Sequence, residues 1–259
     1  MEFRPCIDIH NGKVKQIVGS TLKDAGDLAE ENFVSEKDAA FYAKLYQKYG
    51  LKGGHVILLN KEGSPFFEAT KEQALSALLA YPGGLMIGGG ITDANAAQYL
   101  EAGASHVIVT SYLFEDGKLS WEKMEKLASA AGREHVVFDL SCKRYEDGYH
   151  IMTDRWQTKT DAVLNASLLK ELEEYCDEYL IHAVDVEGNA NGIEANLVRE
   201  LSSYEGNAIT YAGGVHSLDD IRLLKEIGLG RIHVTVGSAL DLFGGKLAFS
   251  DILEMCKEI

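Results

Sequence analysis

The sequence predicts an α/β fold: a closed (β/α)8 barrel, or TIM barrel, built from two similar half-barrels. Eight short apolar runs alternate with eight helical patterns along the 259 residues, and this alternation is typical of a parallel sheet. Several motifs recur half a chain length apart, which indicates a duplicated unit. We expect one domain, residues 1–259, with half-barrels at about 1–131 and 132–259. An open doubly wound sheet is the alternative.

The internal repeat rests on three pairs of motifs at nearly the same offset. Gly213-Gly214 follows Gly89-Gly90 by 124 residues (213 minus 89). The motif at 237–238 follows the one at 110–111 by 127 residues (237 minus 110), and the motif at 184–188 follows the one at 59–63 by 125 residues (184 minus 59). The pairs are Gly89-Gly90 with Gly213-Gly214, Thr110-Ser111 with Gly237-Ser238, and 59–63 with 184–188.

Apolar runs predict the strands, and apolar residues spaced three or four apart predict the helices. In the first half we expect strands at 3–9, 55–59, 85–87 and 106–109, helices at 36–49, 68–79, 93–102 and 120–131, a short accessory strand at 12–18 and a long loop at 19–33. In the second half we expect strands at 135–140, 179–184, 208–212 and 232–236, and helices at 162–175, 195–203, 217–227 and 250–257.

Two local signals support these boundaries. Ser217, followed by Asp219 and Asp220, is typical of a helix start, because a serine side chain caps backbone N–H groups and acids favour the first turn. Residues 141–161 form a second long insertion, in which Asp147-Gly148 predicts a tight hairpin turn within 144–150.

Composition limits the classes of function. The chain is 46% hydrophobic and 25% charged, as expected of a globular protein, and its net charge of −15 disfavours nucleic acid and anionic membranes as partners. We see no secretory signal and no long apolar span, so we expect a cytoplasmic protein. The four cysteines are scattered and predict neither a metal site nor disulfides. A closed barrel leaves no open sheet edge, so we expect a monomer.

Two aspartates are the candidate catalytic residues. Asp8 and Asp139 end the first and fifth strands, at equivalent places in the two halves, and these strands face each other in a ring of eight. One carboxylate can remove a proton while the other, kept neutral by burial or by its partner's charge, delivers one. The alternative is that each aspartate caps a loop or pairs with a lysine.

Glycines at the carboxyl ends of strands are candidate phosphate-binding residues. Glycine lets backbone N–H groups approach an anion closely, and a following helix N-terminus adds partial positive charge. One expected site combines Gly89 and Gly90 with Thr110 and Ser111, and the second combines Gly213 and Gly214 with Gly237 and Ser238. The alternative is that these are ordinary strand-to-helix turns.

Several of these segments resemble one family of enzymes. PCIDIHNGKV, GGGI with VTS, FDL, IHAVDVEG and AGGV with VGS are similar to the phosphoribosylformimino-aminoimidazole carboxamide ribotide isomerases of histidine biosynthesis. The resemblance covers nearly the whole chain and is greatest to the eukaryotic type.

The resemblance implies an Amadori rearrangement of an aminoaldose to an aminoketose, on a small substrate that carries a phosphate at each end. It implies that Asp139 is the general acid, which protonates the furanose ring oxygen, and that Asp8 is the general base, which takes a proton from C2 of the sugar. Neither step requires a metal or a redox cofactor.

The resemblance also bears on His182 and on the second insertion. His182 stands where bacterial members usually carry threonine, and it either contacts the sugar or orients Asp139, or is simply a buried histidine. Residues 142–161 would form a mobile lid that brings Trp156 onto the imidazole ring, with Arg144, Arg155 or Lys159 near its carboxamide or a phosphate. A tryptophan exposed on a flexible loop is the alternative.

Three rival functions share features with this interpretation. The sister cyclase of the pathway has the same fold and both aspartates, but it needs a lysine eight residues after the first, where this chain has Gln16. A phosphoribosyl anthranilate isomerase activity, alone or in addition, stays open. A barrel that only binds sugar phosphates is disfavoured, because a protein that binds dianions gains nothing from two acids in its mouth.

Overall fold

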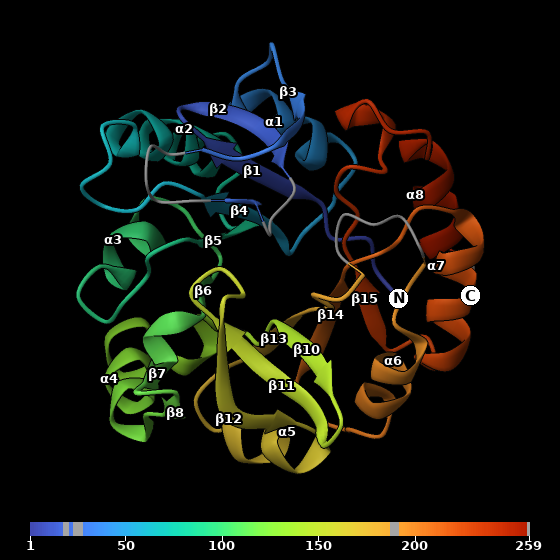
Figure 1. Ribbon diagram of the computed structural model, residues 1–259. Helices are drawn as coiled ribbons and strands as arrows, with labels where there is room; N and C mark the ends of the chain where they lie inside the picture. The colour runs from blue at the N-terminus through green and yellow to red at the C-terminus, as the bar shows by residue number, and fades with distance from the viewer. Residues whose placement is uncertain (18–20, 23–27, 187–191, 258–259) are drawn as a thin grey trace.

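A ring of eight parallel strands forms the centre of the computed structural model, which describes residues 1–17, 21–22, 28–186 and 192–257 (Figure 1). Each strand pairs with its neighbours in the order β1 (Cys6–His10), β4 (Gly54–Leu58), β5 (Leu85–Gly88), β6 (Val107–Val109), β9 (Val136–Asp139), β13 (Glu178–His182), β14 (Ala208–Ala212) and β15 (Ile232–Val234).

The residues before β1 close the ring against β15. Phe3 forms a parallel bridge with Val234, the Arg4 N–H donates to the Val234 carbonyl at 2.8 Å, and the Val234 N–H donates to the Glu2 carbonyl at 3.0 Å. The expected closed barrel is therefore confirmed, and the alternative of an open sheet is wrong.

Eight described helices surround the ring on its outside (Figure 1). They are α1 (Ala39–Lys48), α2 (Phe67–Ala80), α3 (Ala96–Glu101), α4 (Trp121–Ala131), α5 (Ala166–Leu172), α6 (Ala195–Ser202), α7 (Leu218–Ile227) and α8 (Phe249–Lys257). The larger apolar core lies between these helices and the strands, whereas a smaller cluster fills the inside of the barrel: Ile57, Met86, Ile108, Val137, Leu180 and Ala212. The barrel is thus a packed core and not a pore.

The helix starts follow the capping signals in the sequence. Ser217 and Asp220 form a capping box at α7, in which each side chain accepts a hydrogen bond from the other residue's backbone N–H. At α1 the Asp38 carboxylate accepts from the Phe41 N–H at 2.8 Å. Such caps stabilise a helix by about 1 kcal/mol each.

Buried polar groups hold the amino ends of the strands together. Arg4 forms an ion pair with Glu178, and the Thr210 hydroxyl donates to the same carboxylate at 2.9 Å. A buried charge is tolerated only when it is paired and hydrogen-bonded. This cluster therefore has a structural role at the amino ends of the strands.

The first insertion differs from the expected loop. Within the predicted loop 19–33 the described part contains the start of β3 (Glu31–Val34), which pairs antiparallel with β2 (Lys13–Ile17), and β2 in turn pairs with β1. The accessory strand expected at 12–18 is confirmed as β2. Apolar periodicity does not reveal β3, because its residues are mostly exposed and form no apolar run.

The second insertion forms a three-stranded antiparallel sheet of β10 (Cys142–Tyr145), β11 (Gly148–Thr153) and β12 (Thr158–Leu164). The hairpin predicted within 144–150 is confirmed, with Glu146 and Asp147 as its two turn residues and Gly148 paired with Tyr145. The helix predicted from residue 162 is wrong at its start, because residues up to Leu164 pair with β11 and α5 begins only after its cap Asn165. A further small hairpin, β7 (Phe114–Glu115) and β8 (Lys118–Leu119), precedes α4.

The four cysteines are all described and none is in a disulfide. Among the described residues, no helix combines the length and apolar character needed to cross a membrane.

Candidate active site

Asp8 and Asp139 both belong to the layer of side chains that faces the inside of the barrel. Asp8 lies on β1 beside Ile57, a member of the inner cluster, and Asp139 ends β9 two residues after Val137, another member. Side chains two apart on a strand point to the same face. Since β1 and β9 are four strands apart in the ring of eight, the two carboxylates come from opposite sides of the barrel.

Three side chains hold the Asp139 carboxylate. The Ser141 hydroxyl donates to Oδ1 at 2.9 Å, the Thr110 hydroxyl donates to Oδ2 at 3.3 Å, and His182 Nδ1 lies 3.4 Å from Oδ1. Burial by itself would raise the pKa of Asp139, but the charge of His182 and the three hydrogen bonds outweigh it and hold the pKa below its usual value. In the free protein Asp139 is therefore an ionised carboxylate paired with an imidazole.

His55 is a buried histidine of β4 that the sequence analysis did not single out. Its pKa is lowered to about 3, chiefly by burial and then by the charge of His182, against an opposing effect of Asp139. The ring is therefore neutral at physiological pH and can exchange hydrogen bonds without adding charge to the site. The alternation of inward-facing residues on β4, in which His55 precedes Ile57 by two, is the one signal that could have found it.

The first predicted phosphate site lies at the ends of β5 and β6. Gly89 and Gly90 have φ of 105° and 71°, conformations that favour glycine, and a side chain at Gly89 would collide with the Leu58 carbonyl of the neighbouring strand. The Ser111 hydroxyl accepts from the Asp154 N–H at 3.3 Å. The Thr110 hydroxyl, however, donates to Asp139, so this side chain helps to hold the carboxylate.

In the second predicted site, as in the first, a glycine lies close to a backbone carbonyl of the neighbouring strand. Gly213 and Gly214 have φ of 117° and 74°, and a Cβ on Gly213 would lie 2.9 Å from the Ala183 carbonyl at the end of β13. Gly237 follows β15 and packs against the Gln16 side chain. The echoed motif at 184–188 is described only as far as 186, so Glu187 and Gly188 lie outside the described residues.

The turn between β11 and β12 connects to three separate strand ends. The Trp156 ring lies 6.0 Å from the His182 ring, Arg155 Nη2 donates to the Leu59 carbonyl at 3.0 Å, and the Asp154 N–H donates to Ser111. All three turn residues have positive φ, between 50° and 67°, a costly conformation for residues other than glycine. The turn is thus held at the carboxyl ends of the ring strands.

The cationic residues of the insertion lie in different places. Arg144 is exposed on β10, with its guanidinium 5.9 Å from the Tyr149 ring centre and its backbone N–H donating to Asp185. Lys159 stacks on Tyr145. Of the three cations considered from the sequence, only Arg155 lies at the strand ends. Arg144 lies on β10 and Lys159 on β12.

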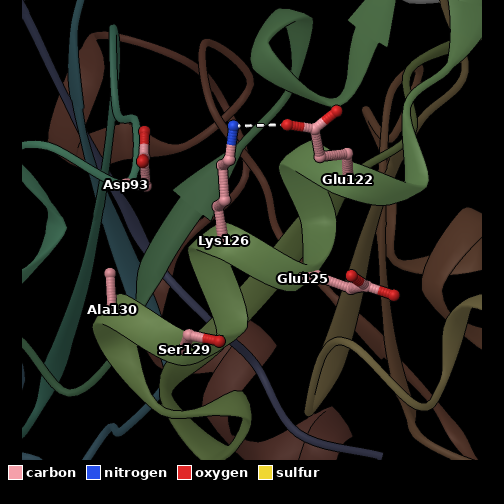
Figure 2. A pocket seen from close by; sticks show the side chains of 6 residues that line it. All are labelled: Asp93, Glu122, Glu125, Lys126, Ser129 and Ala130. Atoms are coloured by element: carbon pink, nitrogen blue, oxygen red, sulfur yellow. Dashed lines mark hydrogen bonds and ion pairs between the residues drawn. The ribbon is translucent and has the colours of Figure 1, made fainter.

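A separate cleft of about 460 Å³ lies on the helical layer beside α4 (Figure 2). Acidic groups dominate its lining, and Lys126 is paired with Glu122 at 2.6 Å. It contains none of the predicted site residues; its lining is Asp93, Glu122, Glu125, Lys126, Ser129 and Ala130. Among the described side chains, no group of three or more His, Cys, Asp or Glu is arranged to hold a metal ion.

A closed ring of eight parallel strands, with two aspartates, His182 and glycine turns at the carboxyl ends, defines a (β/α)8-barrel enzyme. Residues 2–247 match the family described as histidine biosynthesis protein, and the chain belongs to this family.

Curated relatives are similar to nearly the whole of this chain. The chain is 51% identical over 98% of its residues, and over 81% of the relative, to a protein of Medicago truncatula. It is 47% identical to one of Neurospora crassa (94% of this chain, 93% of the relative) and 43% identical to one of Saccharomyces cerevisiae (95% and 94%). All three are named 1-(5-phosphoribosyl)-5-((5-phosphoribosylamino)methylideneamino) imidazole-4-carboxamide isomerase, and the Medicago protein is also called chloroplastic.

Proposed function

We propose that this chain catalyses the isomerisation for which its relatives are named, an Amadori rearrangement of a sugar that carries a phosphate at each end of the substrate. The observation that carries the proposal is the pair of aspartates contributed by opposite strands of the ring, in a chain 51% identical to a named isomerase. Acid–base chemistry on a ribose held between two anchored phosphates needs this arrangement.

The two acids have different surroundings, and this supports a division of roles. Asp139 is ionised in the free protein because His182, Ser141 and Thr110 stabilise its charge, so a neutral Asp139 waiting as proton donor is not supported. We propose instead that the acid is the Asp139–His182 pair, which shares one proton and delivers it to the furanose ring oxygen. Asp8, on the opposite strand, then takes the proton from C2.

The substrate's two ends would bind to the two glycine turns. Gly89, Gly90 and Ser111 offer one set of backbone and hydroxyl donors, and Gly213, Gly214, Gly237 and Ser238 the other. Arg155 lies at the strand ends, so we propose it, and not Arg144, as the cation of the lid. Trp156, already against His182, would stack on the imidazole ring of the substrate.

The activity is tested by turnover of the bisphosphorylated aminoaldose named in the relatives. We expect conversion to the aminoketose without ammonia. Consumption of ammonia with release of imidazole glycerol phosphate would instead indicate the sister cyclase, and comparable turnover of phosphoribosyl anthranilate would indicate dual specificity.

The phosphate sites have their own test. In a crystal soaked in sulfate we expect two anions, one at each glycine turn and both at the same rim of the barrel. A single anion, or anions elsewhere, would contradict the proposed binding of both substrate ends.

We also propose that the chain is one domain made of two similar halves, and a monomer. Equivalent contacts support the duplication: Gly89 packs on the Leu58 carbonyl and Gly213 on the Ala183 carbonyl, at nearly the same offset as the glycines themselves. Sedimentation measures the oligomeric state directly. A cytoplasmic location stays a prediction from the sequence.

A further inference from the structure

Gln16, on β2 outside the ring, reaches back to the candidate general base. Its side-chain Nε2 donates to Asp8 Oδ2 at 3.0 Å and lies 3.7 Å from Cys6 Sγ, and the residue is only 5% exposed. We propose that Gln16 is a positioning residue for the reaction, which fixes the plane of the Asp8 carboxylate as it takes the proton from the sugar. This inference rests on the proposed role of Asp8.

The orientation of the amide follows from chemistry. An ionised carboxylate only accepts hydrogen bonds, so the NH2 group of Gln16 must face Asp8 and the carbonyl oxygen must face away. On that side lies Gly237, where a Cβ would be 2.5 Å from Gln16 Oε1. The amide fits in this orientation because residue 237 has no side chain.

A neutral donor suits a general base better than a cation would. A lysine beside a carboxylate favours the charged form, lowers the carboxyl pKa and weakens the carboxylate as a base. An amide fixes the geometry without adding charge. The neighbouring Lys15 does not supply that charge, since it points to the other face of β2 and forms an ion pair with Glu31.

Several described neighbours of Asp8 and Gln16 are neutral or apolar. Cys6 lies on the same strand, Ile57 of β4 lies beside Asp8, and the Tyr46 hydroxyl of α1 donates to the Cys6 carbonyl at 3.0 Å. Gln16 also packs against Gly237 of the second glycine turn, so one side chain contacts both the base and a proposed phosphate site.

Two substitutions test the proposal by different means. Gln16→Met keeps the length of the side chain but removes the donor, and we expect kcat to fall on the order of 10²-fold with KM nearly unchanged, as for a misplaced catalytic group. Gln16→Glu keeps the shape but sets a second carboxylate beside Asp8. We expect a larger loss of kcat and a shift of the acid limb of the kcat/KM profile to higher pH, because like charges disfavour ionisation.

Gln73→Met is the matched control. Gln73 is half-buried on α2, and its Oε1 accepts from the Ala39 N–H at 3.0 Å, far along the chain from the aspartates. Its loss should leave kcat and the pH profile unchanged even if it lowers the melting temperature. Gln16→Glu, which has the native shape, carries the test if Gln16→Met does not fold.

The decisive experiment combines Gln16→Met with Asp8→Asn. If Gln16 acts through Asp8, its substitution should cause no further loss of rate once the carboxylate is gone. An equal loss in both backgrounds, or a folded Gln16→Met and Gln16→Glu with native kcat and pH profile, would overturn the proposal. Native turnover by Asp8→Asn alone would instead overturn the proposed role of Asp8, so the two failures are distinguishable.

Discussion

His182 Nδ1 lies 3.4 Å from Asp139 Oδ1, at the carboxyl ends of two neighbouring strands. This contact joins His182 to the carboxylate of the proposed acid. It explains why the pKa of Asp139 is held below its usual value although burial alone would raise it. The Trp156 ring lies 6.0 Å from the His182 ring, so the turn between β11 and β12 contacts the histidine of the proposed acid.

Replacing His182 should weaken the proposed acid without abolishing binding. We expect His182→Gln, which keeps a polar side chain of similar size, to lower kcat by about 10²-fold, the lower range for a lost acid–base group, with little change in substrate affinity. Steady-state kinetics with calorimetric binding measures both quantities. His135→Gln, an exposed histidine on another part of the barrel, is the control; a native kcat for His182→Gln would contradict the shared-proton acid.

Because His55 is buried in its neutral form, we expect the free energy of unfolding to fall in mild acid. Its pKa is about 3 in the folded protein, against 6.5 for a free histidine, so the unfolded chain binds the extra proton first as the pH falls. The free energy of unfolding should therefore decrease from pH 6.5 downward, with about 2–3 kcal/mol lost by about pH 4.5 through this residue. Urea unfolding of His55→Gln should show a shallower dependence over this range. The same slope in the variant and the native protein would refute the assignment.

The two glycines of the first turn should respond differently to alanine. Gly89 has φ of 105° and no room beside the Leu58 carbonyl, whereas Gly90 has φ of 71° and nothing within 4 Å. We expect Gly89→Ala to lower the free energy of unfolding by at least about 3 kcal/mol, and Gly90→Ala by about 1 kcal/mol, the cost of the left-handed conformation alone. Urea midpoints of the two variants compare them directly, and equal losses would show that the close backbone approach is not what requires glycine at 89.

The alternation of strands and helices was predictable because each βα unit is encoded locally, by apolar runs followed by capping residues such as Ser217. The insertions were harder to predict. β12 pairs with β11 through backbone hydrogen bonds that no hydrophobic period reveals, and the apolar pattern therefore predicts a helix for its last residues.

The aspartates and the glycine turns could be located because they end strands at repeating positions, and His182 was singled out by the family resemblance. The roles of His55 and Gln16 could not be predicted, nor that Arg155 and not Arg144 lies at the strand ends. These features depend on which side chains meet across the barrel. Gln16 is separated from Gly237 by nearly the whole chain, yet the two are in contact. Only the closed ring brings such residues together.

The central claim is that Asp8 removes the C2 proton from a sugar held between the two glycine turns. Single-turnover kinetics of Asp8→Asn, with substrate binding measured on the same preparation, tests it most directly. We expect turnover to fall by at least about 10³-fold while the dissociation constant and melting temperature stay near native values. Turnover within about tenfold of the native rate, or a variant that fails to fold, would contradict a catalytic role for Asp8.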